Sequence, residues 1–384
     1  MSTPPPESES VASEQSPTHE QTQAHTNERV ARATGIVALG NILSRVLGLA
    51  REMMLSNVFG ASRAVEAFNN ALVISKSLYD LLLAGHVNSA IIPVLSEVAS
   101  VQGQRELWRL VSVLMSIVTV LATAITLLLV VFAPQIVGLI SGTDPQTLLL
   151  SAQLLQFTAP MLILLTLFAV FSGTLYALRS FSLPALAGAI FNGTIVLVTL
   201  ALIPPLEYAA RLSANGGVLW TLQRPTDGII AVAIAWLVAS AAQLALQAYG
   251  LRHARLRFTL NWRHPSVRRI GLLYVPVLFS LVIDTLVIRF FSYNLAARAT
   301  IAHGNTYMNW ATTLIQFPHG LVATAISIAI LPTLSRQAAL MANADPQTAA
   351  QIQRAYKDTL GLGLRLATIL IVPATIGLYV TAEP

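Results

Sequence analysis

Three charged residues, Arg45, Arg51 and Glu52, interrupt the otherwise apolar stretch "SRVLGLAREMM" near the N-terminus. A charge at the centre of a bilayer costs roughly 2.5–3.5 kcal/mol on insertion scales, so such a side chain is expected to face a polar cavity or a partner. On a helix that turns about 100° per residue, these charges and Asn41 fall within an arc of about 140°, and the opposite face is apolar. We therefore expect this helix to line a polar cavity. A buried pair of Arg51 and Glu52 that only fixes helix packing is the alternative.

Two further apolar stretches carry polar side chains at spacings of three and four residues, which place them along one helix face. Arginine is favoured where phosphate is held, because its planar guanidinium donates two parallel hydrogen bonds to phosphate oxygens. The polar faces predict a water-filled cavity, partly cationic, that suits an anionic substrate. The predicted substrate-binding residues are Arg45, Arg51, Glu52, Glu66, Lys76 and Arg289, and the predicted lining residues are Asn41, Asn69, Asn70, Asp80, Asn309, Thr312, Thr313 and Gln316.

Other roles stay open for some of these residues. Glu66 lies near the start of the second helix, where a carboxylate also stabilises the positive end of the helix dipole. Asp80 is expected near the floor of the cavity, where simple solvation is the alternative role. In the seventh helix, Asp284 and Arg289 lie about 140° apart on an ideal α-helix, so we do not expect them to pair.

No sequence pattern points to catalysis. The chain has no P-loop, HExxH or GxSxG motif and no cysteine, which excludes disulfides and thiolate metal sites. We expect a chain that is not an enzyme and that binds no cofactor, with transport driven by a coupling ion, the membrane potential or the substrate gradient. The net charge of +6 does not indicate nucleic-acid binding, because the basic residues lie in short loops between apolar runs.

The elements that must position these residues are membrane helices. Of 384 residues, 55% are hydrophobic and 10% are charged, whereas soluble domains carry about 25% charged residues. Runs such as 111–132 exceed the roughly 20 apolar residues needed to cross a bilayer. We predict an all-α polytopic membrane protein of about nine transmembrane helices, with kinks at Gly85, Pro134, Pro160 or Pro332. The predicted spans are 33–57, 64–99, 107–141, 146–179, 183–204, 228–251, 270–298, 305–338 and 352–382.

The helices are organised into regions around a central cavity. Residues 1–30 are polar and predict a disordered cytoplasmic tail. Helices one to six form an N-lobe over 31–251, a basic cytoplasmic linker covers 252–269, and three helices form an incomplete C-lobe over 270–384. Most loop lysines and arginines fall on one side, which places the N-terminus in the cytoplasm. The basic linker sets topology and joins the lobes, with binding of acidic lipid headgroups as the alternative.

Five motifs resemble the MurJ/MviN family of bacterial lipid II flippases. They are "SRVLGLARE" (44–52), "FGAS" (59–62), "EAF" (66–68), "IIPVLSE" (91–97) and "QFPHGLVATAISIAILPTLSR" (316–336). The resemblance implies the fold of the multidrug/oligosaccharidyl-lipid/polysaccharide exporter superfamily, in which two helical lobes surround a cavity. It also implies more helices than are predicted here, so we expect a divergent and C-terminally truncated member.

The resemblance implies a substrate as well as a fold. The substrate would be lipid II, an undecaprenyl-pyrophosphate-linked peptidoglycan precursor, moved from the inner to the outer leaflet of the bacterial cytoplasmic membrane. Arg45, Arg51 and Glu52 match charged cavity residues of the family. A family arginine on the second helix aligns with Tyr79, and a family Asp-Arg pair on the eighth helix aligns with residues 312–313, which are threonines here.

The function expected from these observations is flipping of lipid II by alternating access, with the pyrophosphate held by cavity arginines. Two alternatives stay open, namely a flippase for another lipid-linked saccharide and a transport-inactive membrane scaffold of cell-wall synthesis. The expected partners are a lipid-linked anionic substrate, membrane lipids and cell-wall synthesis proteins, and no nucleic acid.

Overall fold

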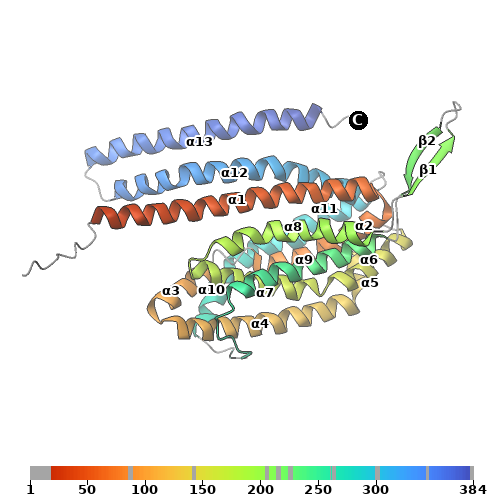
Figure 1. Cartoon of the computed structure of the whole chain (residues 1–384), viewed down its shortest axis with the longest axis horizontal. Helices are drawn as coiled ribbons and strands as arrows, with labels where there is room; N and C mark the ends of the chain where they lie inside the picture. Colours follow the sequence, from red (N-terminus) through yellow and green to blue (C-terminus); the bar gives the residue numbers. More distant parts are fainter. Residues whose placement is uncertain are drawn as a thin grey trace, which may run out of the picture.

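The computed structural model describes residues 19–84, 90–140, 144–203, 207–212, 218–223, 228–259, 261, 265–298, 303–342 and 346–380, and nearly all of these are helical (Figure 1). Two π-helical segments, η1 (Asp80–Ala84) and η4 (Ile283–Arg289), continue α2 and α10. The α-helices are α1 (His19–Phe59), α2 (Arg63–Tyr79), α3 (Ile92–Val101), α4 (Gln104–Val131), α5 (Ala133–Gly138), α6 (Pro145–Thr158), α7 (Met161–Ala177), α8 (Ser182–Leu202), α9 (Ile229–Gly250), α10 (Pro265–Val282), α11 (Phe290–Ala297), α12 (Gly304–Ala342) and α13 (Pro346–Val380).

One small β-hairpin is the exception to the predicted all-α fold. Strands β1 (Glu207–Leu212) and β2 (Val218–Gln223) pair antiparallel, with Glu207 opposite Gln223. The hairpin projects from one end of the bundle between α8 and α9 (Figure 1). It lies in a polar stretch that the sequence analysis left outside the predicted helices.

Local chemistry explains where several helices begin and bend. Ser62 caps α2, where its hydroxyl accepts a hydrogen bond from the backbone N–H of Val65, and Asp144 caps α6 in the same way. Breaks fall at or beside two predicted positions, since α4 ends just before Pro134, which lies in the first turn of α5, and α6 and α7 meet at 42° around Pro160. At Pro332 the helix α12 continues without a break, and Gly85 lies outside the described residues.

Each predicted span coincides with helical segments. However, nine membrane crossings are not found when the helices are judged by their length and apolar character. Within the described part of the chain, four helices are long and apolar enough to cross a membrane, or five if α6 and α7 form one bent span. Several predicted spans are divided, since α2 passes into η1 at Asp80 and α10 passes into η4 at Ile283. A hydropathy pattern cannot show such local changes in helix type.

The helix α1 begins at His19, inside the predicted disordered tail of residues 1–30. Residues 1–18 lie outside the described part of the chain. The tail was predicted from its small capacity to bury apolar surface. Residues 19–30 nevertheless contain helix-forming Glu, Gln, Ala and Arg, which let α1 extend beyond its apolar portion.

Small residues allow α1 to approach α8 closely. The backbone of Ala185 lies against Gly40, and the hydroxyl of Ser44 lies against Gly188. On its other side α1 lies beside α12, which lies beside α13 (Figure 1). Buried residues of α2, α6, α7 and α9 form the main apolar core. These contacts place α1 and α2 of the first half of the chain opposite η4, α11 and α12 of the second half.

Candidate functional site

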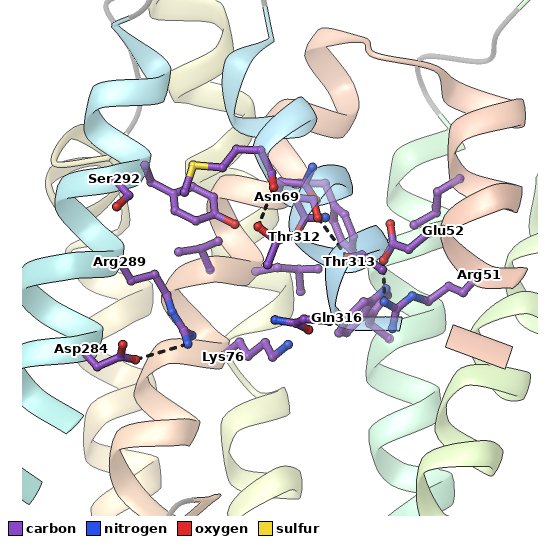
Figure 2. A pocket seen from close by; sticks show the side chains of 18 residues that line it. Arg51, Glu52, Asn69, Lys76, Asp284, Arg289, Ser292, Thr312, Thr313 and Gln316 are labelled. Carbon is purple, nitrogen blue, oxygen red and sulfur yellow. Dashed lines mark hydrogen bonds and ion pairs between the residues drawn. The ribbon is translucent and has the colours of Figure 1, made fainter. Parts of the chain in front are cut away.

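A cavity of about 300 Å3 lies where α1, α2 and α9 face η4, α11 and α12 (Figure 2). Polar and apolar side chains share its wall. The predicted residues that line it are Arg51, Glu52, Asn69, Lys76, Arg289, Asn309, Thr312, Thr313 and Gln316. The others are Leu55, Phe68, Leu72, Val73, Trp236, Asp284, Ser292, Tyr293 and Met308.

Arg51 is held in one orientation by three neighbours. Its Nη2 lies 2.5 Å from Glu52 Oε1, and its Nη1 donates a hydrogen bond to Asn192 Oδ1 at 2.8 Å. The guanidinium carbon lies 4.9 Å from the ring centroid of Trp236, within the range of a cation–π interaction. The amide of Asn192 is itself fixed, because it donates to the carbonyl oxygen of Ser44 at 3.0 Å. The Arg51–Glu52 pair is thus present, and both of its side chains also line the cavity.

Arg289 lies on the opposite wall and pairs with two carboxylates. Its Nη1 is 3.1 Å from Asp80 Oδ2, and its Nη2 is 3.8 Å from Asp284 Oδ2. The expectation that Asp284 and Arg289 would not pair is wrong. They lie five residues apart in η4, and the i to i+5 hydrogen bonds of a π-helix bring such residues onto one face. The prediction assumed an α-helix, which separates them by about 140°.

Lys76 enters the cavity from the last turn of α2, between the walls that carry Arg51 and Arg289 (Figure 2). Among the described residues, ion pairs join the two arginines to carboxylates, and none joins Lys76 to a carboxylate. The lining contains three cations against the two carboxylates Glu52 and Asp284. Asp80, which lies just outside the lining, also pairs with Arg289, and Lys76 is the cation of the lining that makes no ion pair with a described carboxylate.

The helix α12 provides an uncharged polar wall. The hydroxyls of Thr312 and Thr313 donate to the carbonyl oxygens of Met308 and Asn309, at 2.8 and 3.0 Å. Gln316 follows on the same wall. The resemblance implied a charged pair at the two threonine positions. The cations of the cavity come instead from α1, α2 and η4.

Arg45 and Asn41 lie outside the cavity lining. Arg45 Nη1 donates to the carbonyl oxygen of Gln316 at 3.3 Å, and its guanidinium lies against Gly320, where a Cβ atom would collide with it. Asn41 is exposed one turn earlier on α1. Both residues share the polar arc of α1 with Arg51 and were therefore expected in the cavity. However, α12 packs against α1 at the level of Arg45, so the cavity opens only beside the later part of the arc.

Polar pairs join the first part of α2 to the start of α12 at one end of the cavity, and they are referred to below as the Glu66 contacts. Of the three α2 residues in these pairs, Asn69 also lines the cavity, whereas Glu66 and Asn70 lie beyond it. The pairs are Glu66 Oε2 with His303 Nδ1 at 2.7 Å, Asn305 Nδ2 with Asn70 Oδ1 at 2.8 Å, and Asn69 Nδ2 with Thr306 Oγ1 at 3.5 Å.

A second group joins the other end of α2 to α10 and η4, and is referred to below as the Asp80 contacts. Arg289 pairs with Asp80 and also lies 3.4 Å from Ser77 Oγ. The hydroxyl of Tyr274 donates to the carbonyl oxygen of Leu81. Asp80 itself does not line the cavity. The part of α2 between the Glu66 contacts and the Asp80 contacts forms the cavity wall.

Two residues that position Arg51 were not predicted from the sequence. Asn192 is the only amide side chain in the apolar helix α8, and this isolation was the available signal. Trp236 lies in apolar α9, where an aromatic residue gives no signal of a site. Tyr79, aligned with a family arginine, packs against the apolar core and lies outside the cavity lining.

A smaller hollow of about 200 Å3 opens between α1 and α12. It shares Glu52 and Thr313 with the cavity, so the two spaces meet at these side chains. Its remaining lining includes the apolar residues Leu49, Met53 and Trp310. The cavity therefore has an apolar neighbour on the side between α1 and α12.

A family model described as "Lipid II flippase MurJ" matches residues 55–384, which is most of the chain. The chain belongs to the MurJ family. This finding confirms the resemblance to the MurJ/MviN family, and four of the five motifs lie within the matched residues. It also identifies the cavity as that of a MurJ-family protein.

Named relatives and solved structures agree with membership of the MurJ family. The lipid II flippase MurJ of Burkholderia cenocepacia is 29% identical over 366 residues, covering 92% of this chain and 64% of the relative. A solved lipid II flippase MurJ in an inward closed conformation matches with a TM-score of 0.67 at 20% identity, over 89% of this chain and 64% of that one. The chain thus spans less than two thirds of the length of these MurJ proteins.

The fold is also similar to that of a solved multidrug transporter. The solved MATE multidrug transporter DinF-BH matches with a TM-score of 0.61 at 12% identity, over 93% of this chain and 75% of that one. At such low identity the likeness shows the fold alone. The fold expected from the motifs is therefore shared between this MurJ-family chain and a MATE transporter.

Proposed function

We propose that this MurJ-family chain flips lipid II from the inner to the outer leaflet of the bacterial cytoplasmic membrane, and that its cavity holds the pyrophosphate. The observation that carries the proposal is the convergence of Arg51, Lys76 and Arg289 on one cavity among apolar helices. Pyrophosphate is a multiply charged anion, and guanidinium groups donate paired hydrogen bonds to its oxygens. A cavity lined by three cations suits this headgroup.

The carboxylates have a supporting role in this proposal. Burying an unpaired cation is costly, and Glu52 and Asp284 offset that cost for Arg51 and Arg289 while the cavity is empty. The Nε of Arg51 is buried and has no hydrogen-bond partner among the described residues, so this guanidinium retains a donor. Lys76 contributes a cation that forms no ion pair with a described carboxylate. The uncharged wall of α12 then faces the sugar and peptide of the headgroup.

Alternating access is supported by the two groups of contacts that bracket the cavity along α2. With the N-terminus in the cytoplasm and α1 as the first membrane crossing, the Glu66 contacts lie on the outer side and the Asp80 contacts on the inner side. Opening the Asp80 contacts frees Arg289 from Asp80 as the headgroup enters from the inner leaflet. Opening the Glu66 contacts then releases the headgroup outward. One group must stay closed while the other opens.

The hollow between α1 and α12 gives the lipid tail a path from the cavity to the bilayer. A polyprenyl chain is apolar and remains in the bilayer at lower free energy than in a polar cavity. The hollow joins the cavity at Glu52 and Thr313, and four of its other six lining residues are the apolar Leu49, Met53, Trp310 and Leu314. The pyrophosphate can therefore occupy the cavity while the tail passes between the two helices.

Complementation tests this function in a bacterium depleted of its own lipid II flippase. We expect the wild-type chain to restore growth and Arg51→Ala to fail at equal membrane abundance. Arg298→Ala is the matched control, because this arginine is exposed at the end of α11 and lies outside the cavity lining. Failure of the inserted wild-type chain to restore growth, or growth with Arg51→Ala equal to wild type, would contradict the proposal.

A further inference from the structure

The segment between α9 and α10 is fixed along α4 by its backbone. The N–H of Arg257 donates to Ser112 Oγ at 3.0 Å, and the N–H of Thr259 donates to Ser116 Oγ at 2.8 Å. Leu256 packs against the apolar cluster that contains Leu107 and Leu110 of α4. Residues 252–259, referred to below as the tethered linker, therefore have a defined place on the bundle.

The spacing of the bonded groups on the two segments explains why this attachment is specific. Two residues along an extended segment rise about 6.6 Å, and four residues along an α-helix rise about 6 Å, so alternate N–H groups match hydroxyls at i and i+4. Each serine hydroxyl donates to its own helix, Ser112 to Trp108 O and Ser116 to Ser112 O, both at 2.7 Å. The hydroxyl oxygens remain available as acceptors for the tethered linker.

The tethered linker presents basic side chains and one large aromatic side chain outward. Arg252, Arg255 and Arg257 are exposed, and Phe258 is 61% exposed. The charged residues of α4 lie only in its first two turns, which places the aqueous end of α4 there. Ser112 lies eight residues after the first residue of α4, about 12 Å along its axis. The exposed arginines and Phe258 thus lie where α4 passes from water into apolar surroundings.

Neighbouring residues extend the positive surface. Arg105 and Arg109 are exposed at the start of α4, and Arg268 is exposed at the start of α10. The nearby described carboxylates are already engaged, since Glu97 lies 2.8 Å from Arg269 Nη1 and Glu106 lies 3.8 Å from Arg109 Nη1. The arginines of the tethered linker have no such partner among the described residues.

We propose that the tethered linker is a binding surface for the headgroups of anionic phospholipids. Topology requires only that basic residues occupy the right position in the sequence, and it does not require two backbone tethers. A fixed row of arginines beside an exposed phenylalanine at interfacial depth matches an anionic membrane surface in both charge and apolar character. This inference goes beyond the proposed function and does not depend on which substrate the cavity carries.

Native mass spectrometry of the purified full chain, titrated with phosphatidylglycerol or phosphatidylcholine, tests the inference. We expect the wild type to bind phosphatidylglycerol more tightly than phosphatidylcholine. The double variant Arg255→Gln with Arg257→Gln should lose about fivefold in affinity for each arginine. The matched control, Arg354→Gln with Lys357→Gln, removes two exposed cations from α13 and should keep the affinity of wild type.

A second variant separates a built surface from charge alone. Ser112→Ala with Ser116→Ala removes both tethers and no charge, and we expect it also to weaken binding of phosphatidylglycerol. The inference is overturned if the double arginine variant loses no more affinity than the α13 control. It is equally overturned if the serine variant keeps the full affinity, because the fixed position would then be irrelevant.

Discussion

Replacing Asn192 on α8 with alanine should weaken lipid II binding without removing any charge from the cavity. Asn192 accepts the hydrogen bond from Arg51 Nη1 at 2.8 Å. A hydrogen bond to a charged group contributes about 1.5–3 kcal/mol. Glu52 and Trp236 still hold the guanidinium in Asn192→Ala, so we expect the lower end of that range. A loss of about 1.4 kcal/mol corresponds to a tenfold weaker Kd.

The assay is titration of fluorescent lipid II into the full chain held in nanodiscs. Thr199→Val is the control for α8, because the hydroxyl of Thr199 is buried without a hydrogen-bond partner among the described residues and makes no contact with Arg51. In an Arg51→Ala background, Asn192→Ala should have no further effect on Kd, since its role acts through Arg51. Fully additive losses, or wild-type binding by a folded Asn192→Ala variant, would refute the reasoning.

Three further outcomes are expected. In the same titration, Lys76→Met should weaken lipid II binding at least tenfold, and Lys76→Arg should retain most of it. Equal Kd values for the wild type and both variants would exclude a role for the charge. Glu66→Ala removes the pair with His303, so a single cysteine introduced elsewhere in the cavity of this cysteine-free chain should be labelled faster from outside; an unchanged rate would count against the Glu66 contacts as an outer closure. The Thr147 hydroxyl lowers the pKa of Asp144, so this cap stabilises the fold above the unfolded-state pKa and loses its effect as pH falls through the lower folded pKa. Asp144→Ala should therefore reduce Tm at neutral pH and match the wild type in acid, and a Tm difference that persists in acid would contradict this.

Periodicity along single helices predicted much of the cavity. Arg51, Glu52 and Lys76 were each expected because polar residues recurred on one face of an otherwise apolar helix, and the structure places all three in the lining. Such a pattern is informative because a charge in the bilayer is costly, so charged side chains are expected to face a cavity or a partner. The family could also be predicted, because its motifs include the residues of that face.

Relations between helices could not be predicted in the same way. Arg45 shares the polar arc of α1, but only the packing of α12 decides that it contacts Gln316 and lies outside the cavity. The pair of Asp284 and Arg289 depends on a π-helical segment, which hydropathy does not reveal. Asn192 can be recognised as a partner of Arg51 only from the packing of α8 beside α1.

Reconstitution into vesicles tests the central claim most directly. The full chain would be placed in vesicles with fluorescent lipid II in the inner leaflet, and the rate at which the headgroup becomes accessible outside would be measured. We predict faster appearance with the wild-type chain than in protein-free vesicles, and a rate near that of protein-free vesicles with Arg51→Gln combined with Arg289→Gln. A wild-type rate equal to that of protein-free vesicles, or a double variant as fast as the wild type, would contradict a cationic cavity that carries lipid II.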